Sequence, residues 1–482
     1  MYNIIFYDKI KEIEHEVIAD VQEVEDEETG EKKDVIVYET ITKKYRVPTK
    51  LVFNTATNCD EFFKDNIFID DFVMDMPSLD SAKSMFENST ITKISGEGEE
   101  EILIIDDNTL TVSTSARFPS LTSGDNMFKD CDNLTSISID LDSLKKVEGL
   151  FENCSSLTSF TGSLGSLENG QSLFIGSPNL NTFYANIDSL TNGTAMFKNT
   201  KISTFYNELP SLEKGDEMFN STPLIKFEIN MPSLESANSM FQNCVVLETF
   251  NSVLGSLKSG NSMFYNCDKL ESLILDMPSL ESGENMFYSC SKLKSFTGSL
   301  SSLKRGNCMF EQTVIATFVT DNLDSLESGN KMFWANKFLN WSIDLPKLKD
   351  GFQMFYGSIR PGGNNGLQTF TADLSSLENG TQMFAECSSL QNFNCVLPKL
   401  DSAVEMFKSC KLSPQSVMNI VESLPTKNSS RSITIGINSA NDTDSLNQFA
   451  INTGLYKDWA ELNSTAISKN WNITWEYNAN TN

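Results

Sequence analysis

One stretch of the sequence, residues 151–174, decides how the rest of the chain is interpreted: FENCSSLTSFTGSLGSLENGQSLF. It begins and ends on Phe, and Leu167 precedes the second Phe by seven residues. This Leu-to-Phe spacing occurs fourteen times, mostly at intervals of 22 or 23 residues, and is usually written Ser-Leu…Met-Phe. We call its aromatic residue the repeat Phe; the positions are Phe86, Phe128, Phe151, Phe174, Phe197, Phe219, Phe241, Phe264, Phe287, Phe310, Phe333, Phe355, Phe384 and Phe407. So strict a period predicts a solenoid of stacked coils, none of which can bury its apolar face alone.

The apolar residues within one coil fit a short turn of chain better than a long helix. We expect the Leu-x-x-Phe segment, as in residues 157–160, to be a strand, and successive strands to form a parallel sheet with Ser and Thr outward. A short helical turn such as GENMF (283–287) is expected to place Met and Phe beneath this sheet. Gly stands four residues before the repeat Phe in ten coils, and Ala replaces it in others, so close packing explains the position better than a positive φ.

Seven of the ten cysteines stand three residues after a repeat Phe: Cys131, Cys154, Cys244, Cys267, Cys290, Cys387 and Cys410. Stacked coils would place them in a column ~4.8 Å apart with parallel side chains. A disulfide needs Cβ atoms about 3.5–4.5 Å apart and converging, so neighbours in such a column are poorly placed to bond. We predict reduced thiols that pack as small apolar groups.

The composition excludes several classes of partner. The net charge is −28 and the pI near 4.4, so the surface repels nucleic acid and anionic membranes. No stretch approaches the ~20 consecutive apolar residues of a membrane span. The N-terminus, MYNIIFYDKIKEIEHEVIAD, is charged from Asp8 onward and lacks a cleavage site, so it does not read as a secretory signal.

The repeat divides the chain into three predicted parts. Residues 1–66 precede it and read as a β-hairpin around the polar turn EETGEKK, with Val17, Ile18, Val21 and Val24 opposed to Val35, Val37 and Tyr38. Residues 67–410 form the solenoid. Residues 411–482 form a C-terminal α/β cap, with a helix in SPQSVMNIVESL and strands in SITIGI and WNITWEY.

Two intervals break the regular spacing. Between Phe86 and Phe128 we expect one degenerate coil, with EILIIDDNTLTV as its strand region. Between Phe355 and Phe384 there are six extra residues, and SIRPGGNNGLQ is expected to form a protruding loop in residues 356–368. Loops that interrupt a solenoid favour contacts, although a tolerated insertion explains this one equally simply.

The pattern G-x-x-M-F-x-x-C-x-x-L-x-x-F, as in GENMFYSCSKLKSF (283–296), resembles BspA-like leucine-rich repeats. Such repeats occur in bacterial and mycoplasma surface proteins, in some protists and in gut bacteriophages. The resemblance covers about residues 68–410 and specifies a scaffold rather than a site.

The C-terminal part resembles the unit that follows such repeats in bacteriophage tail and other virion proteins. The matching residues, in order, are Ser416, Val417, Asn419, Ile420, Ile435, Gly436, Ala466, Lys469 and Trp471. The segment GLYKDWAELNST (454–465) departs from the short form of that unit, which implies an altered contact surface. Bacterial surface members usually carry a secretion signal and an anchor, so the resemblance favours the virion.

Candidate chemistry is sparse. The single histidine, His15, lies in the hairpin with no nucleophile nearby, and no phosphate-binding, dinucleotide or Cys-x-x-Cys motif occurs, so we expect neither a cofactor nor catalysis. The acidic runs around Asp70, Asp106 and Glu97–Glu101 read as solvated faces, with a divalent cation as the alternative. Candidate contact residues are Trp334, Trp341, Arg360, Asn364, Asn365 and Trp459, with at least one of Trp334 and Trp341 expected in the core.

The leading functional hypothesis is therefore a non-enzymatic structural or adhesion protein of a bacteriophage particle. The hairpin would attach it to other virion proteins or to a sister chain, and the remaining surface would contact a host protein or glycan. The alternative is an adhesion protein of the bacterial surface, exported by an unusual route. A polysaccharide-cleaving enzyme is the third hypothesis, and it lacks the carboxylate cluster that such an activity needs.

Overall fold

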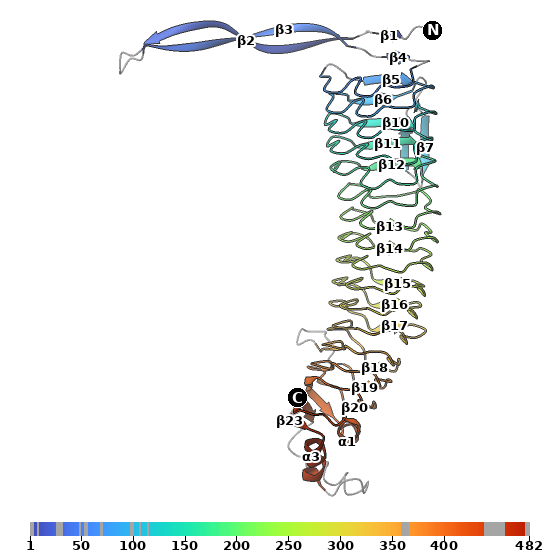
Figure 1. The fold of residues 1–482 in the computed structure, drawn as a ribbon, viewed down its shortest axis with the longest axis vertical. Helices are drawn as coiled ribbons and strands as arrows, with labels where there is room; N and C mark the ends of the chain where they lie inside the picture. The colour runs from blue at the N-terminus through green and yellow to red at the C-terminus, as the bar shows by residue number, and fades with distance from the viewer. Residues whose placement is uncertain are drawn as a thin grey trace. The chain divides into compact units, whose positions relative to one another are not determined.

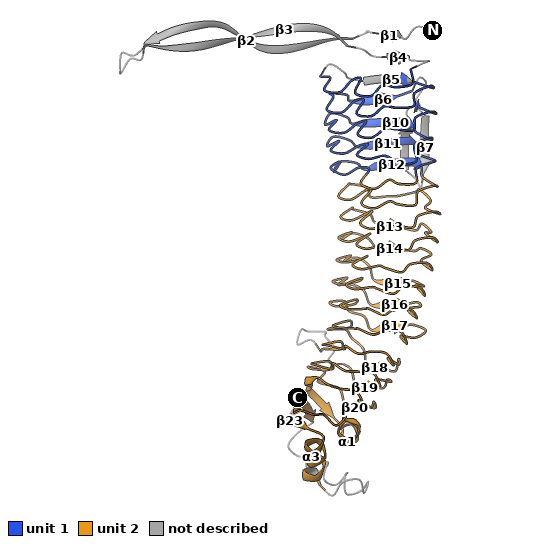
Figure 2. Cartoon of the chain, in the orientation of Figure 1, with its two compact units in different colours: residues 1–167, 173–186 blue, residues 168–172, 187–482 orange. Residues whose placement is uncertain are grey.

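The computed structural model describes residues 4–6, 9–25, 32–47, 50–52, 56–67, 71–96, 101–105, 108–112, 115–357, 366–437 and 458–477, with backbone alone for the strands before residue 56 and for 101–112. The chain divides into two compact units (Figure 2): residues 1–167 with 173–186, and residues 168–172 with 187–482. Figure 1 labels the helices and strands. We describe each unit by itself.

The first unit is built on one 8-stranded sheet. Its strands run in the order β1 (Ile4–Phe6), β4 (Lys50–Val52), β5 (Asp71–Asp75), β6 (Lys93–Ser95), β10 (Ser136–Asp140), β11 (Ser159–Ser163) and β12 (Thr182–Asn186), and β9 (Ala116–Arg117) also pairs with β5 and β10. Only β1 and β4 pair antiparallel; from β4 onward the pairing is parallel. The predicted parallel sheet is therefore confirmed.

The predicted N-terminal hairpin is also present. Strand β2 (Lys9–Glu25) pairs antiparallel with β3 (Lys32–Val47), and Ile18 faces Tyr38 in the register. Because β1 and β4 flank the hairpin in sequence and pair with each other, the hairpin leaves the sheet at its first two strands.

The degenerate coil predicted between Phe86 and Phe128 is wrong. The two rings stack directly, with centroids 5.4 Å apart, and the Phe86 N–H donates to the Met127 carbonyl at 2.8 Å. The extra residues form a second hairpin, β7 (Glu101–Ile105) with β8 (Asn108–Val112). In the register with β10, Ile94 faces Ile137 and Ala116 faces Ile139, so β6 and β9 are two halves of one strand position that this hairpin interrupts. The segment lacks a Leu-to-Phe pair to enter the core, and it pairs with itself instead.

One aromatic residue ahead of the predicted solenoid joins its core. Phe63 stacks on Phe86 at 5.3 Å, and the Cys59 N–H donates to the Ser81 carbonyl at 2.9 Å. Phe63 stands 23 residues before Phe86, but Ala56 replaces the Leu expected seven residues before it, which is why the repeat pattern missed it.

The second unit continues the same coil in short parallel sheets. The strands are β13 (Lys226–Phe227) with β14 (Thr249–Phe250); β15 (Ser272–Ile274), β16 (Ser295–Thr297) and β17 (Thr317–Val319); and β18 (Asn340–Trp341), β19 (Thr369–Phe370) and β20 (Asn392–Phe393). Each falls at the end of a Leu-x-x-Phe segment or its equivalent, as predicted.

Two columns of aromatic rings meet in the core. All fourteen repeat Phe residues, and the Leu seven residues before each, are 0% exposed. Within a column the rings stack, as Phe241 does on Phe264 at 5.6 Å. Across the core they meet edge to face, as Phe241 does with the strand residue Phe250 at 5.3 Å and 72°. This edge-to-face arrangement adds about 0.5–1.5 kcal/mol per pair beyond burial.

The segment opposite the sheet is not the helical turn that we predicted. Residues two before and two after the repeat Phe are left-handed, as Ser262 (φ 56°) and Asn266 (φ 63°) show. Their N–H groups, and that of Phe264 between them, donate to carbonyls of the next coil at 2.8–2.9 Å. These bonds between coils replace the bonds within a helix. A Cβ on Gly260 would lie 3.0 Å from Met286 Cε, so the predicted packing role of this glycine position is confirmed.

The cysteine column contains free, buried thiols, as predicted. Each thiol also donates to the carbonyl of the repeat Phe of the preceding coil, as Cys267 Sγ does to Phe241 at 3.1 Å and Cys290 Sγ to Phe264 at 3.1 Å. Ser177 makes the same bond to Phe151 at 2.9 Å. The position therefore requires a hydrogen-bond donor as well as small volume.

The last coil leads into a parallel sheet of β21 (Ala403–Leu412), β22 (Arg431–Ile437) and β23 (Trp471–Tyr477), with helices α1 (Pro414–Ser423) and α3 (Trp459–Ser468). Ser413 caps α1 and Pro414 is its first residue, as predicted. The Ser416 hydroxyl accepts from the Phe393 N–H at 2.9 Å and donates to the Gln391 carbonyl at 3.0 Å. Helix α1 thus satisfies backbone groups of β20, the last strand of its sheet.

Candidate binding surface on the turn side of the coils

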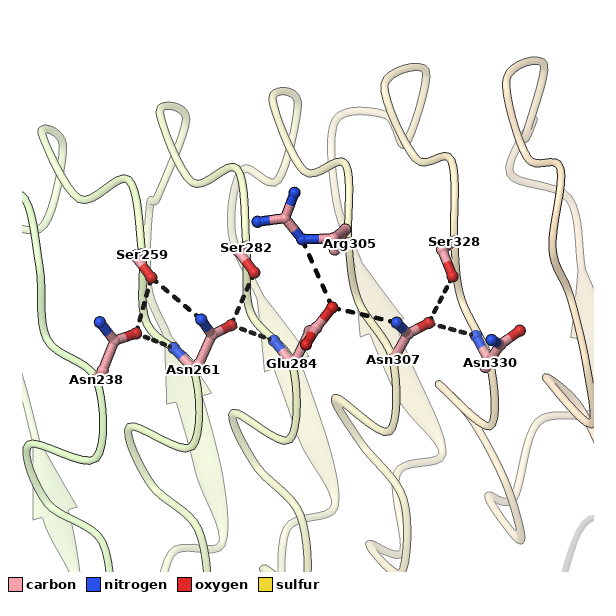
Figure 3. Close-up of polar contacts among 9 residues, drawn as sticks. All are labelled: Asn238, Ser259, Asn261, Ser282, Glu284, Arg305, Asn307, Ser328 and Asn330. Atoms are coloured by element: carbon pink, nitrogen blue, oxygen red, sulfur yellow. Dashed lines mark hydrogen bonds and ion pairs between the residues drawn. The ribbon is translucent and has the colours of Figure 1, made fainter.

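The side of each coil opposite the sheet presents regular columns of side chains to solvent. We call this the turn side, and define it as the outward residues from five before to two after each repeat Phe. Figure 3 shows part of it in the second unit. The Oδ1 atom of Asn261 accepts from the Ser282 hydroxyl at 2.8 Å and from the Glu284 N–H at 2.9 Å. Asn238 and Asn307 make the corresponding bonds to their following coils. This ladder fixes the register of neighbouring coils.

One step of the ladder is built from charged residues. Glu284 stands where the neighbouring coils have Asn, and Arg305 stands where they have Ser (Figure 3). The Arg305 Nε lies 3.5 Å from Glu284 Oε1, and Asn307 Nδ2 donates to the same oxygen at 3.2 Å. The pair therefore preserves the contact between these coils.

An aromatic column runs beside this ladder. Tyr265, Tyr288, Trp334 and Tyr356 each follow a repeat Phe directly and are half-buried. Tyr265 and Tyr288 stack at 4.9 Å, and Trp334 and Tyr356 at 6.1 Å. We call these four residues the aromatic column. Tyr and Trp are the side chains most enriched at the energetic centres of protein interfaces.

Many exposed carboxylates are committed to bonds between coils. At the position after the repeat Leu, Lys258 pairs with Glu235 at 2.7 Å, Lys304 with Glu281 at 2.9 Å, and Lys349 with Glu327 at 3.1 Å. The hydrogen bond from Lys304 lowers the pKa of Glu281, and that from Lys349 lowers the pKa of Glu327. These carboxylates are ionised partners in a structural ladder, which makes them unsuited to general-acid chemistry.

A hollow of about 440 Å³ lies where the last coil meets α1, lined by Asn394, Cys395, Val396, Asn419, Glu422 and Ser423. Its volume is within the range of small-molecule sites. Gln415 Nε2 already donates to Asn419 Oδ1 at 2.8 Å, and burial raises the pKa of the Cys395 thiol to about 12. The hollow offers amide and carboxylate groups without a nucleophile.

The thiols are poor nucleophiles. Burial raises the pKa of Cys131 and of Cys290 to about 12. Half-buried Cys308 behaves alike, because burial and hydrogen bonding to Glu311 raise its pKa to about 12. Among the residues whose side chains are described, no group of three or more His, Cys, Asp or Glu is arranged to hold a metal ion.

The predicted contact residues have different fates. Trp341 belongs to the core: it is 3% exposed, stacks on Phe318 at 5.9 Å, and donates from Nε1 to the Ile343 carbonyl at 2.9 Å. It is not offered to a partner. Trp334 is half-buried in the aromatic column. Arg360, Asn364 and Asn365 lie outside the described residues, as do Asp70, Asp106, Glu97 and the side chain of Trp459.

Sequence reasoning singled out Trp334 but missed the rest of the aromatic column. The signal was present, because all four aromatic residues follow a repeat Phe directly. No helix among the described segments is long and apolar enough to cross a membrane.

Known proteins share this architecture. Solved structures with similar folds include a leucine-rich repeat protein from Bacteroides ovatus (18% identity, 88% of this chain and 86% of that chain, TM-score 0.40). Others are a leucine-rich cell surface protein from Faecalibacterium prausnitzii (15%, 73% and 84%, TM-score 0.30) and the pneumococcal vaccine antigen PcpA (13%, 91% and 86%, TM-score 0.31). No curated protein sequence matches the chain.

The family comparison is specific to the repeats. The BspA type leucine-rich repeat region matches residues 80–203, 121–248 and 212–340, which together cover more than half of the chain. These segments contain the coils whose Leu, Phe and Cys positions build the core described above. The chain belongs to the BspA-type leucine-rich repeat family.

Proposed function

We propose that this chain is a non-enzymatic adhesion protein of a bacterial surface, and that the turn side of its second unit contacts the partner. The observation that carries the proposal is the aromatic column, in which Tyr265, Tyr288, Trp334 and Tyr356 stand half-buried beside a rigid polar ladder. Interface energy concentrates in such anchored Tyr and Trp side chains. Repeat proteins of this kind use extended surfaces for binding, and the family is one of surface proteins.

The state of the chemical groups supports a binding role over catalysis. The thiols of the core are protonated donors to backbone carbonyls, and the carboxylates after the repeat Leu are held in ion pairs between coils. Groups engaged in this way stabilise the scaffold and leave recognition to its outward side chains.

The proposal is tested by binding of the purified chain to an array of host glycans and glycoproteins. Replacing Trp334 by Ala should weaken adhesion at least tenfold, because truncating a central aromatic anchor typically costs more than ~2 kcal/mol. The matched control is Glu271→Gln on the sheet side, where the exposed ion pair with Lys294 (2.9 Å) contributes little. Equal binding by all three proteins would remove the aromatic column from the contact.

A role in a bacteriophage particle is the second candidate, which the C-terminal resemblance through Ser416, Asn419 and Trp471 favours. The two candidates place the chain differently. Protease shaving of intact producing cells should release its peptides if it is a surface protein. Purified particles should contain it if it is a virion component, and its enrichment there with no release from cells would favour the virion.

A further inference from the structure

Glu311 has no counterpart in the pairing scheme of the turn side. It follows a repeat Phe directly, between Tyr288 of the preceding coil and Trp334 of the next, within the aromatic column. The side chain is 7% exposed, and among the described residues none forms an ion pair with it. A carboxylate removed from water without a counter-charge costs folding free energy, and such groups are concentrated at functional sites.

The same position carries a charge in other coils, and there the charge is paired. In the first unit Glu87 pairs with Lys64 at 3.3 Å and Lys129 with Glu152 at 3.0 Å. In the second unit Lys408 pairs with Glu405 at 2.8 Å, and Lys198 pairs with Glu217. Glu311 is therefore an exception to the rule that the scaffold applies elsewhere.

Two nearby donors are engaged with other groups. Arg305, in the same coil, pairs with Glu284, and Gln312 Nε2 donates to the Tyr288 hydroxyl at 2.9 Å. The Cys308 thiol shares a hydrogen bond with Glu311, which leaves the carboxylate its charge and at least one oxygen for a further donor.

The two flanking rings turn their available faces toward this carboxylate. Tyr265 covers one face of Tyr288, and Tyr356 covers one face of Trp334. The remaining face of each ring points to the coil of Glu311. The repeat Phe rings beneath are 5.1 Å (Phe287 to Phe310) and 5.6 Å (Phe310 to Phe333) apart, so each ring lies about one coil, roughly 5 Å, from the level of the carboxylate.

We propose that Glu311, Tyr288 and Trp334 bind an ammonium group presented by the partner. A cation held at the carboxylate would lie within the ~6 Å at which an aromatic face attracts a positive charge, on both sides. A rounded ammonium suits two faces about 10 Å apart better than a flat guanidinium, which must approach one ring closely. The site gives the proposed adhesion surface a ligand class, and in that sense it rests on the proposed function.

Ligand-observed NMR of the full chain with tetramethylammonium chloride tests the site, with sodium chloride at equal ionic strength as competitor. We expect saturable binding that Glu311→Gln weakens at least tenfold and Trp334→Ala at least fivefold, while Glu271→Gln leaves it unchanged. N-acetyl-lysine amide is the second probe: tighter binding than tetramethylammonium identifies a protein lysine as the source, and weaker binding a trimethylammonium group. Binding by Glu311→Gln within twofold of the unmodified chain, or equal displacement by sodium, would overturn the site.

Thermal unfolding separates a binding role from a structural one. If Glu311 is held for a ligand, Glu311→Gln should leave Tm unchanged or raise it, and tetramethylammonium should raise Tm for the unmodified chain alone. A lower Tm for Glu311→Gln would mean that the carboxylate supports the fold, and the proposal would fail. Adhesion that depends on Trp334 without ammonium binding would retain the surface and reject its ligand class; the reverse result would retain the site and reject adhesion.

Discussion

The residue three positions after the repeat Phe shows how one backbone group constrains sequence. Cys, Ser, Thr and Asn occupy this position, and they share a hydrogen-bond donor. In coils with Cys the donor serves the preceding coil, as Cys267 serves Phe241. In coils with Thr it serves its own coil, as Thr222 does for Phe219 at 2.8 Å. The Thr coils are also one residue shorter between repeat Phe and strand Phe, so donor type and coil length change together.

Replacing Cys267 should separate packing from hydrogen bonding. Cys267→Ala would leave the buried Phe241 carbonyl without its side-chain donor, which costs about 1–3 kcal/mol. Cys267→Ser keeps a donor that this fold accepts at Ser177, so its cost should be smaller. Urea unfolding of the three proteins measures the order. Equal stability of the Ala and Ser variants would show that volume alone matters.

Stability should decrease with pH through the thiols. Burial raises the pKa of Cys290 from 9.0 to about 12 in the folded chain. Above pH 9 the unfolded chain therefore binds fewer protons than the folded one, and stability falls as pH rises toward 12. Each such thiol contributes up to about 1.4 kcal/mol per pH unit. Tm measured from pH 8 to 11 should fall less steeply for Cys290→Ser, and identical slopes would contradict this prediction.

At the scale of the elements, the sequence predicted the strands better than the connections. Leu-x-x-Phe segments became parallel strands because each places alternate residues in the core. The turn after each Gly was wrong because its backbone bonds run between coils, and no local pattern encodes a partner 22 or 23 residues away. The capping helix was predictable because Ser413 and Pro414 act within one turn.

The inserted hairpin of β7 and β8 should be removable. Joining Ser95 to Ala116 would unite β6 and β9 into one strand, since both already pair with β5 and β10 in continuous register. The deletion shortens the interval from Phe86 to Phe128 to the length of an ordinary coil. We expect Tm to change by only a few degrees in thermal unfolding, because loops of this kind contribute little to the core. Loss of folding would show that the hairpin is part of the solenoid.

At the scale of the whole molecule, the N-terminal hairpin of β2 and β3 is the proposed attachment arm. Because β1 and β4 pair directly, residues 8–48 can be replaced by a four-residue turn that leaves Phe6 facing Lys50. We expect this variant to fold with unchanged Tm and to lose attachment to the cell surface or particle, measured by its fraction in the wash. Full retention would assign attachment elsewhere.

The candidate site could be predicted only in part. Trp334 was visible because a Trp beside an irregular loop is unusual, whereas Trp341 looked similar and proved to be a strand residue of the core. Glu311 was hidden among 65 acidic residues. Its significance depends on burial and on missing ion pairs among the described residues, and both are properties of the folded chain.

The backbone hydrogen bonds between turns have a mechanical consequence. In the second unit they join each coil to the next, as Phe264 is joined to Met286, so a pull along the stack loads them in series. The weakest junction then yields first, while its neighbours stay folded. Each released coil pays out 22 or 23 residues, or roughly 80 Å of chain. A tethered molecule of this design would lengthen stepwise under flow and so limit the force that reaches its bound partner.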